Sequence, residues 1–294
     1  MHKPVLLNEV IKVLDIQPGD TVLDGTVGGG GYLEAICELA GKKGIVIGLD
    51  QDKSALERVE KEECVCQRYL TNENFRNLGK VLDGLNIEKV DKIVFDLGLS
   101  SDQLENSGQG FSFQKDEPLL MTFKSVLTKD DLTAEEIVNN WNEQNLADII
   151  YAYGEERFAK RIAKQICEAR RKQPIKTTFD LLKIIKTATP ERYRRGKTHF
   201  ATKTFQALRI TVNDEIGALK EGLEKGFERL NKGGRMAVIS FHSLEDRAIK
   251  RFFKQQKNER RGILIAKKPI IPSKEEIQKN PRARSAKLRG IQKL

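Results

Sequence analysis

The sequence predicts an α/β fold in which an open parallel sheet is interrupted by a helical insertion. Strand and helix patterns alternate through the first hundred residues, as in parallel sheets with crossover helices. From residue 106 to 199 the pattern is helical only, and an α/β pattern then resumes. We therefore expect 1–105 and 200–294 to form two parts of one sheet domain, with 106–199 inserted between them.

The amino-terminal elements are predicted from apolar runs that end at glycine or acidic residues. The carboxyl ends of parallel strands line one rim of a sheet, which is where open α/β folds bind ligands. The expected elements are helix Asn8–Leu14, strand Thr21–Asp24, helix Leu33–Leu39, strand Gly44–Leu49, helix Lys53–Lys61, a helix near Phe75–Leu85 and strand Lys92–Leu97.

The later part of the chain is predicted in the same way. The resumed α/β pattern begins with one long helix, Thr204–Leu230, followed by the turn NKGG and the apolar strand Arg235–Phe241. The insertion shows no strand pattern. Its expected helices cover Ala134–Val138, Leu146–Tyr151, Glu155–Arg171 and Phe179–Thr187.

Composition and charge indicate a globular protein with a polyanionic partner. Hydrophobic residues make up 39% of 294 residues, and there is neither an apolar run of about 18 residues nor a signal peptide, so we expect a cytoplasmic location. The net charge is +10, and the segment from Asp246 onward holds 16 Lys and Arg against four Asp and Glu. Such a basic segment favours binding to phosphates, and a solvated charged tail is the alternative.

The four cysteines do not form the C-x-x-C pairs that are typical of zinc sites. Cys37 and Cys167 fall on apolar faces of expected helices. Reduced core thiols are the favoured interpretation, and no metal site is predicted. The alternative is that Cys64 and Cys66 contact one another or a metal.

The segment Thr21–Tyr32, TVLDGTVGGGGY, combines a strand, an acid and a glycine-rich loop. Such a loop lets a ligand approach the backbone and the start of the next helix. The dinucleotide fingerprint G-x-G-x-x-G fails here, and the P-loop fails because Gly31 stands where lysine is needed. The pattern that remains resembles the first motif of methyltransferases that use S-adenosylmethionine, and a turn without a ligand is the alternative.

Two further acids stand at strand ends. Asp50 follows Asp24 by 26 residues and is predicted to accept hydrogen bonds from both ribose hydroxyls of an adenosine. Its alternative role is to cap a helix, which Asp52 or Ser54 would do equally well. Asp96 ends the next strong strand and would face the donor and the substrate.

Two groups of polar residues follow later strands. Ser100, Ser101 and Gln103 follow Asp96 in one short loop and offer hydrogen bonds to an adenine or a nucleobase, although such residues are ordinary in loops. In SFHSLEDR, His242 is a candidate base or nucleobase contact, or a neighbour of a helix cap. Ser243 with Asp246 forms a possible capping box. The absence of G-x-S-x-G argues against a hydrolase.

Several separated segments together resemble one family, the bacterial ribosomal RNA small-subunit methyltransferase H family, formerly MraW. The resemblance covers almost the whole chain. It implies a class I S-adenosylmethionine-dependent methyltransferase core with an inserted helical domain, and methylation of the exocyclic amino group (N4) of a cytidine in the decoding region of 16S rRNA. The matching segments are HKPVLLNEV, DGTVGGGGY, FDLGLSSDQL, GFSF, YGEERFAKRIAKQI, HFATKTFQALRITVNDEI, VISFHSLEDR and NPRARSAKLR.

The resemblance also implies a donor site and partners. The partners would be 16S rRNA or the small ribosomal subunit, with no membrane, and the oligomeric state stays open, a homodimer included. Phe75 is implied beside the adenine only by the family pattern, and its alternative is a core aromatic. Asp96 and His242 are the candidate catalytic residues, and the helical insertion is expected to recognise the substrate. The implied cofactor-binding residues are Gly30, Gly31, Tyr32, Asp50, Phe75, Asp96 and Gln103.

The chain departs from the family pattern at two places. Tyr32 stands where the family usually has histidine, and Leu120–Lys124 replaces an Asp-Met-Arg-Met-Asp pattern after GFSF. The second change concerns substrate choice more than donor binding. It supports two alternatives: an amino-methyltransferase for another RNA or DNA, or an RNA-binding assembly factor without catalysis. A nicotinamide enzyme is disfavoured by the glycine spacing.

Overall fold

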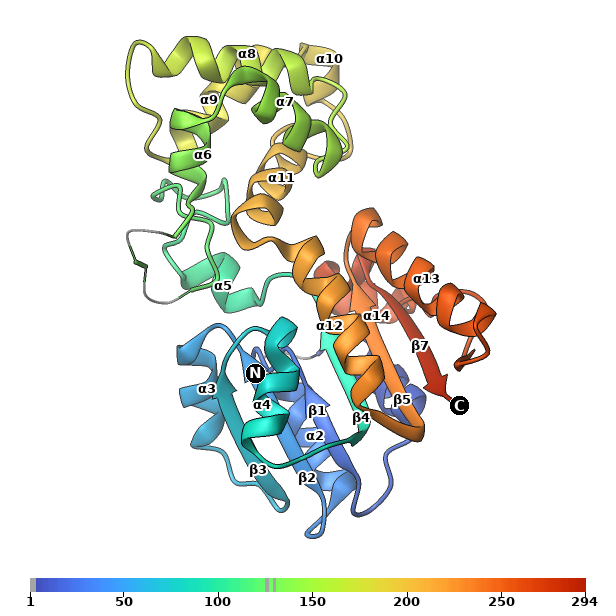
Figure 1. The fold of residues 1–294 in the computed structure, drawn as a ribbon. Coiled ribbons are helices and arrows are strands. Elements are labelled where there is room, and N and C mark those ends of the chain that lie inside the picture. The colour runs from blue at the N-terminus through green and yellow to red at the C-terminus, as the bar shows by residue number, and fades with distance from the viewer. Residues whose placement is uncertain (1–3, 125–126, 129–130) are drawn as a thin grey trace. The chain divides into compact units, whose positions relative to one another are not determined.

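The computed structural model describes residues 4–124, 127–128 and 131–294, without the side chains of 101 and 102. The chain divides into two compact units (Figure 1). Residues 1–98 and 216–294 form the sheet unit, and 99–215 form the helical unit. The helical unit extends on both sides beyond the 106–199 range expected from the sequence. None of the described helices combines the length and the apolar composition that a membrane span requires.

The sheet unit contains one seven-stranded sheet with the order β3-β2-β1-β4-β5-β7-β6. Strands β1 to β5 are parallel, and β7 pairs antiparallel with both β5 and β6. The expected parallel sheet is therefore confirmed. The strands are β1 Thr21–Asp24, β2 Ile45–Asp50, β3 Gln67–Asn72, β4 Val90–Asp96, β5 Leu230–Ser240, β6 Gly262–Leu264 and β7 Lys287–Lys293.

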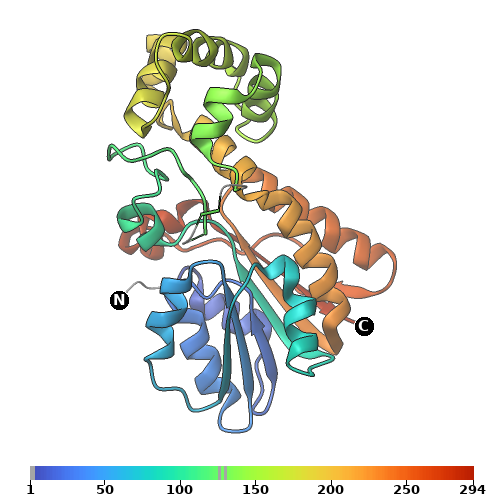
Figure 2. The ribbon, with the colours of Figure 1, turned by 60° about the vertical axis from the view of Figure 1, so that its left-hand side comes forward.

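Helices cover both faces of this sheet. One apolar cluster joins the sheet to α1, α2 and α3, and a second joins its other face to α4, α12 and α13. Figure 2 shows α4 and α12 on one side of the strands and the blue amino-terminal helices on the other. The helices of this unit are α1 Leu7–Leu14, α2 Gly31–Ala40, α3 Lys53–Glu60, α4 Leu78–Gly84, α12 Glu215–Arg229, α13 Ser243–Asn258 and α14 Lys274–Lys279, with 3-10 turns η1 Phe75–Asn77 and η2 Pro281–Ser285.

Two predicted elements differ from the structure. The single helix expected over Thr204–Leu230 is wrong, because Asp214 adopts a left-handed conformation (φ 46°) and separates α11 from α12. The expected turn NKGG lies within β5, where the pairing with β4 shifts its register. β5 therefore accommodates these four residues as an irregularity in its pairing with β4, and no separate turn precedes the strand.

Three strands, β3, β6 and β7, were not predicted from the sequence. β3 is an edge strand whose residues are half-buried or exposed, so it lacks the apolar run of a central strand. The basic carboxyl-terminal segment is not a solvated tail, since β6 and β7 complete the sheet. Leu288 and Ile291 of β7 are fully buried. Its place in the sheet depends on pairing with β5, which is distant in sequence.

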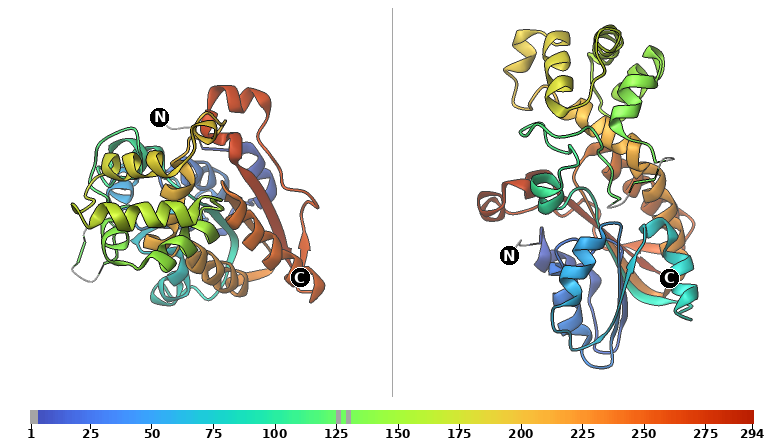
Figure 3. Two further views of the ribbon diagram at one scale, coloured as in Figure 1. Left: turned by 90° about the horizontal axis from the view of Figure 1, so that it is seen from above. Right: turned by 90° about the vertical axis from the view of Figure 1, so that its left-hand side faces the viewer.

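The helical unit has its own apolar core, to which α6, α7, α8, α9 and α11 contribute. Helices α8 and α9 lie side by side (Figure 3, left). Side chains at the N-caps of α6, α7 and α9, Thr133, Asn142 and Thr177, accept hydrogen bonds from their first turns. No strand occurs in its described residues. The helices are α5 Ser101–Asn106, α6 Ala134–Asn140, α7 Glu143–Ala152, α8 Ala159–Arg170, α9 Thr178–Ala188, α10 Glu191–Arg194 and α11 Thr202–Asn213.

Candidate functional site

The glycine loop, residues 25–30, connects β1 to α2. Hydrogen bonds to both neighbouring strands hold it: the Gly25 N–H donates to the Val94 carbonyl of β4 (2.9 Å), and the Val27 N–H donates to the Leu49 carbonyl of β2 (3.1 Å). The loop therefore has its backbone position set by the sheet, as a rigid ligand-binding loop requires.

Two glycines that the sequence assigned to donor binding are packed against the protein. A Cβ on Gly30 would lie 2.7 Å from Val59, and a Cβ on Gly31 would lie 2.3 Å from Pro4. Neither position accepts a side chain without displacing its neighbour. Around Gly29, by contrast, the space for a Cβ is open among the described residues. We therefore expect the accessible backbone of this loop to centre on Gly29, and donor contact by Gly30 and Gly31 stays a prediction.

Asp24 is a fully buried acid at the end of β1. Its Oδ1 accepts a hydrogen bond from the Thr26 N–H (3.0 Å), whereas its Oδ2 has no partner among the described residues. Burial, reinforced by the nearby Asp50 carboxylate, raises the pKa of Asp24 to about 7 against the opposing effect of Thr26. The sequence marked this acid only as a strand end, and the structure makes it part of the site.

The raised pKa of Asp24 predicts a specific pH dependence of stability. Between about pH 4 and pH 7 the folded chain keeps a proton that the unfolded chain, with an ordinary pKa of 3.8, has lost, so this group lowers stability as pH rises through that range. Asp24→Asn should therefore stabilise the ligand-free chain at pH 7.5 by on the order of 2–4 kcal/mol and have a smaller effect at pH 4. Urea unfolding of both proteins at the two pH values measures this; equal effects at both would contradict it.

Asp96 lies at the end of β4. In the sheet, β1 lies between β2 and β4. Its N–H donates to the Thr26 hydroxyl oxygen (2.6 Å), which ties the end of β4 to the glycine loop. Its Oδ1 is buried and has no hydrogen-bond partner among the described residues. Burial, followed by the charges of Asp24 and Glu245, raises the pKa of Asp96 well above its ordinary value. This oxygen therefore has acceptor capacity that no described residue uses.

Asp50 ends β2 and fastens the glycine loop. Its Oδ2 accepts from the Gly28 N–H (2.7 Å) and its Oδ1 from the Asp52 N–H (2.8 Å). Burial raises its pKa, partly offset by these bonds. The alternative role of Asp50 as a helix cap is excluded, because Asp52 caps α3 by accepting from the Ser54 N–H (3.0 Å). The Gln51 N–H is a third backbone donor to this carboxylate, so part of its acceptor capacity is already used, and the contact with both ribose hydroxyls stays a prediction.

Phe75 begins η1, directly after β3, and is partly buried. Its ring lies 4.9 Å from that of Phe95, measured between centroids, and packs over Gly222, whereas Gly25 lies against the Phe95 ring and the Phe75 Cβ. Gly222 thus makes room for the Phe75 ring, and Gly25 makes room for the Phe95 ring. The partial exposure of Phe75 is compatible with a ring that covers a ligand. Its packing is equally compatible with the alternative of a core aromatic residue, so the contact with adenine stays a prediction.

Two glycines of α12 offer a matched test of Phe75. A Cβ on Gly222 would lie 2.5 Å from Phe75 Cδ2, whereas one on Gly226 would meet the flexible end of Met236 at 2.9 Å. Both changes to alanine gain about 1 kcal/mol of helix propensity. Gly222→Ala should displace the ring and weaken donor binding about tenfold, or ~1.4 kcal/mol, while Gly226→Ala leaves it unchanged. Calorimetric titration with S-adenosylhomocysteine checks this, and equal affinities in both variants would leave Phe75 as a core residue only.

Tyr32, on α2, is almost fully buried (4% exposed). Its hydroxyl donates a hydrogen bond to the Val5 carbonyl, so it fastens the amino-terminal segment to the start of α2. Burial, together with the charges of Asp96 and Asp24, raises its pKa well above the ordinary value. The side chain is therefore a neutral phenol used internally, and its contact with the donor stays a prediction.

His242 is the N-cap of α13. Its Nδ1 accepts from the Glu245 N–H (3.4 Å), and Glu245 Oε2 accepts from the backbone N–H groups of His242 (3.3 Å) and Phe241 (2.8 Å). His242 Nε2 lies 3.2 Å from Glu245 Oε1. Sequence reasoning missed Glu245, a nearly buried acid whose signal was its position three residues after the cap. A proton-accepting role for His242 stays a prediction.

The capping box predicted for Ser243 with Asp246 is wrong, because α13 begins one residue earlier. The Asp246 carboxylate instead accepts hydrogen bonds from Arg289 Nε (2.7 Å) and Lys287 Nζ (3.1 Å) of β7. These ion pairs hold the pKa of Asp246 below its ordinary value against the effect of its partial burial. Asp246 is therefore a structural residue that joins α13 to the last strand.

Gln103 belongs to the helical unit. It forms a capping box with Ser100: the Gln103 N–H donates to the Ser100 hydroxyl oxygen (3.1 Å), and the Ser100 N–H donates to Gln103 Oε1 (3.0 Å). The side chain of Ser101 lies outside the described residues. These bonds give Ser100 and Gln103 a structural use, and the donor contact of Gln103 stays a prediction.

The altered segment Leu120–Lys124 is folded into the helical unit. Asn213 on α11 donates to the Met121 carbonyl (2.7 Å) and accepts from the Phe123 N–H (2.9 Å). Met121 and Thr122 are buried, and Lys124 pairs with Asp131. Met121 and Thr122 therefore serve packing in this chain, whereas Lys124 is exposed and serves an ion pair.

Comparison with known proteins identifies the family. The model of the MraW methylase family matches residues 1–294. The chain belongs to this family. Proteins named ribosomal RNA small subunit methyltransferase H are similar along the full chain: 43% identity in Ruminiclostridium cellulolyticum and 44% in Acetivibrio thermocellus, each covering 100% of this chain and 99% of the relative. The relative from Carboxydothermus hydrogenoformans is 44% identical, over 100% of this chain and 98% of its own length.

Membership of the MraW methylase family confirms the predicted class I methyltransferase fold and S-adenosylmethionine as its donor. The residues present fit this donor. It carries a cationic sulfonium and ammonium, two ribose hydroxyls and an adenine. The buried acceptor oxygens of Asp24 and Asp96 have no partner among the described residues and match cationic or N–H groups, and Asp50 retains acceptor capacity. The sheet unit thus supplies acceptors at neighbouring strand ends.

Proposed function

We propose that this chain transfers a methyl group from S-adenosylmethionine to the exocyclic amino nitrogen (N4) of a cytidine in the decoding region of 16S rRNA, in the cytoplasm where ribosomal subunits are made. The observation that carries the proposal is the 43–44% identity, along the full chain, to proteins named ribosomal RNA small subunit methyltransferase H. The choice of a cytidine in the decoding region as the target is inferred from the resemblance to the family, which rests on motifs such as FDLGLSSDQL and VISFHSLEDR.

Asp96 is proposed as the residue that acts on the target nitrogen. The donor supplies an already activated methyl group, so the protein mainly has to align the nitrogen and exclude water. A cytosine amino nitrogen is a poor nucleophile because its lone pair is delocalised into the ring. Asp96 Oδ1, which has no hydrogen-bond partner among the described residues, is a buried acceptor that would hold an amino hydrogen and favour the nucleophilic state of the nitrogen.

Asp96 is also proposed to accept the proton that the methylated nitrogen releases. The methylated nitrogen loses a proton, and Asp96, His242 or water accepts it. The raised pKa of Asp96 favours its protonated form in the ligand-free chain, and the positive charge of a bound sulfonium would favour the carboxylate that can accept the proton. His242 has its Nδ1 engaged with the Glu245 N–H, so Asp96 is the better placed acceptor. The target base has to leave its stack to reach such a pocket.

RNA binding is proposed to use the basic residues of both units, with the helical unit reading the substrate. On α13 the side chains of Lys250, Arg251, Lys254 and Lys257 are exposed at helical spacing. Contacts between such residues and phosphates release counterions, which makes binding sensitive to salt. The altered segment Leu120–Lys124 favours one second candidate, an amino-methyltransferase for another RNA or for DNA, since its charges differ from the family pattern.

The test is a transfer assay with radiolabelled S-adenosylmethionine. Unmethylated small ribosomal subunits, naked 16S rRNA and DNA are offered as substrates, and the modified nucleoside is identified by mass spectrometry. Label in N4-methylcytidine from rRNA would support the proposal, and the better of the two RNA substrates would show when in assembly the enzyme acts. Label in DNA or in another nucleoside would favour the second candidate. Donor binding without transfer to any substrate would indicate an assembly factor.

A further inference from the structure

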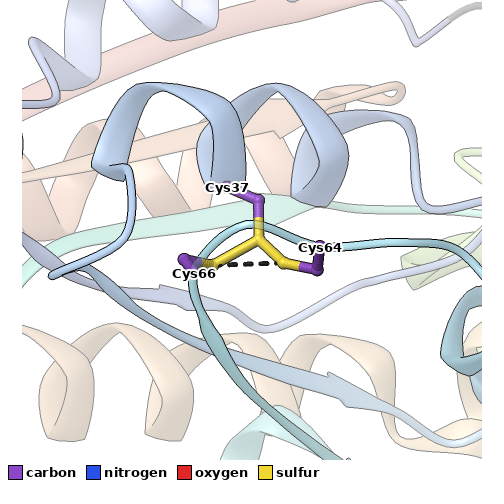
Figure 4. A group of neighbouring side chains, drawn as sticks. All are labelled: Cys37, Cys64 and Cys66. Carbon is purple, nitrogen blue, oxygen red and sulfur yellow. Dashed lines mark hydrogen bonds between the residues drawn. A yellow bond between two sulfur atoms is a disulfide. The ribbon is translucent and has the colours of Figure 1, made fainter.

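Three cysteines from two separate segments meet in the sheet unit. Cys37 lies in the last turn of α2, and Cys64 and Cys66 lie between α3 and β3. Their sulfur atoms all lie within 4.8 Å of one another, and those of Cys64 and Cys66 are 3.2 Å apart. Figure 4 shows the Cys37 sulfur between the other two and joined to both. A sulfur atom carries only one disulfide, so a disulfide cannot account for all three groups.

The cluster, defined as Cys37, Cys64 and Cys66, is held in place by its surroundings. Cys37 and Cys66 are 3% and 8% exposed and belong to an apolar core, and Cys64 is half-buried against it. The guanidinium of Arg68 donates to the carbonyls of Glu60 and Glu62, both at 3.1 Å, which fixes the segment leading to Cys64. The three sulfurs therefore converge at one place, and Cys64 is the most exposed of the three residues.

The chemistry of three convergent thiols selects a soft metal ion. Buried thiolates need a nearby positive charge, because burial in apolar surroundings disfavours the charged form. Thiolate ligands select Zn²⁺ and Cu⁺, whereas Mg²⁺ and Ca²⁺ prefer oxygen. Zinc–sulfur bonds of about 2.3 Å put sulfurs about 3.8 Å apart in a tetrahedral site. In the structure the Cys37 sulfur is joined to both others and those of Cys64 and Cys66 are 3.2 Å apart, so in the reduced chain all three sulfurs have to move apart, that of Cys37 most, to hold an ion.

We propose that Cys37, Cys64 and Cys66 bind one thiophilic d¹⁰ metal ion, Zn²⁺ or Cu⁺, as thiolates. Each thiol releases its proton on binding, and no electron is transferred. Three thiolates satisfy Cu⁺ in a trigonal site, and Zn²⁺ would take water as its fourth ligand beside the half-buried Cys64. The ion would join α2 to the segment before β3 and so stabilise the sheet unit. This role is independent of the methyl transfer proposed above.

The experiment uses the full chain, purified under reducing conditions. The reduced apoprotein is titrated with Zn²⁺ and, separately, with Cu⁺ in competition with a chromophoric chelator. Metal content is measured by mass spectrometry. The variants are Cys37→Ser, Cys64→Ser and Cys66→Ser, and the matched control is Cys167→Ser, which changes a buried cysteine of the helical unit. One equivalent of metal should bind to the original chain and to the control, and each cluster variant should lose stoichiometric binding.

Two further readouts make the result decisive. Saturating metal should raise the melting temperature of the original chain and of Cys167→Ser but not of Cys64→Ser, whose half-buried position makes it the variant best able to fold. The preferred ion distinguishes the zinc site from the copper site. No binding of either ion by the reduced chain, or equal binding by Cys64→Ser, would overturn the proposal. A disulfide from Cys37 to Cys64 or Cys66, mapped in a chain that binds no metal, would assign the cluster to redox chemistry instead.

Discussion

Replacing Asp96 with alanine should abolish methyl transfer without weakening the fold. The buried Oδ1 of Asp96 has no hydrogen-bond partner among the described residues, so no internal bond of this atom is lost. Burial and the neighbouring acids Asp24 and Glu245 raise its pKa, which shows that the folded chain disfavours the charged carboxylate. Its removal should leave the free energy of unfolding at pH 7 equal or higher. A residue that served only the fold would give the opposite result.

The expected loss of turnover is about 10²–10⁴-fold, the usual contribution of a positioned proton acceptor. The measurement is single-turnover methyl transfer at saturating donor and RNA, so that binding does not limit the rate. Asp96→Asn, which keeps the size of the side chain, is the companion variant. Calorimetric titration with S-adenosylhomocysteine separates any loss of donor affinity from loss of chemistry. Unchanged single-turnover rates in both variants would remove Asp96 from its proposed role.

Replacing Asp50 with alanine should chiefly weaken donor binding. A hydrogen bond to a charged group contributes about 1.5–3 kcal/mol, so losing one should raise the dissociation constant of the donor by about 10- to 100-fold. Turnover at saturating donor should change little. The neighbouring Asp52→Ala provides the control, because Asp52 caps α3 and its loss should cost about 1 kcal/mol of stability without an effect on donor affinity.

Asp50 also holds the Gly28 and Asp52 backbone N–H groups, so its loss could act through the loop. A 2′-deoxy analogue of S-adenosylhomocysteine separates the two effects. The original chain should bind the analogue less tightly than the parent compound, and Asp50→Ala should bind both equally, since a missing carboxylate cannot sense the missing hydroxyl. An undiminished preference for the parent compound in Asp50→Ala would show that Asp50 does not contact the ribose.

Predictability differed sharply among the strands of the sheet unit. Strands β1, β2 and β4 were predicted because they are buried on both faces and read as continuous apolar runs that end in Asp24, Asp50 and Asp96. β7 had no such signal, because its residues gain their partner only from β5, far away in the sequence. Local patterns report burial, whereas strand pairing depends on the whole sheet.

The candidate site residues show the same division. The acids at the strand ends were found from the sequence, since parallel strands bring their carboxyl ends to one rim. Glu245 was missed because its importance comes from its place beside His242 and Asp96. The glycines were found as a group, but only the structure separated Gly30, which packs on Val59, from the open position at Gly29.

The sequence by itself therefore determined the fold class, the family, the donor and the acids at the sheet rim, because these depend on local runs, spacings and ordered motifs. The tertiary structure alone decided the break between α11 and α12 at Asp214, the cap formed by His242 and the meeting of Cys37 with Cys64 and Cys66. Each of these depends on backbone geometry or on contacts between segments distant along the chain. Backbone geometry of this kind and contacts between distant segments cannot be inferred from the residue types and spacings of a short stretch of sequence.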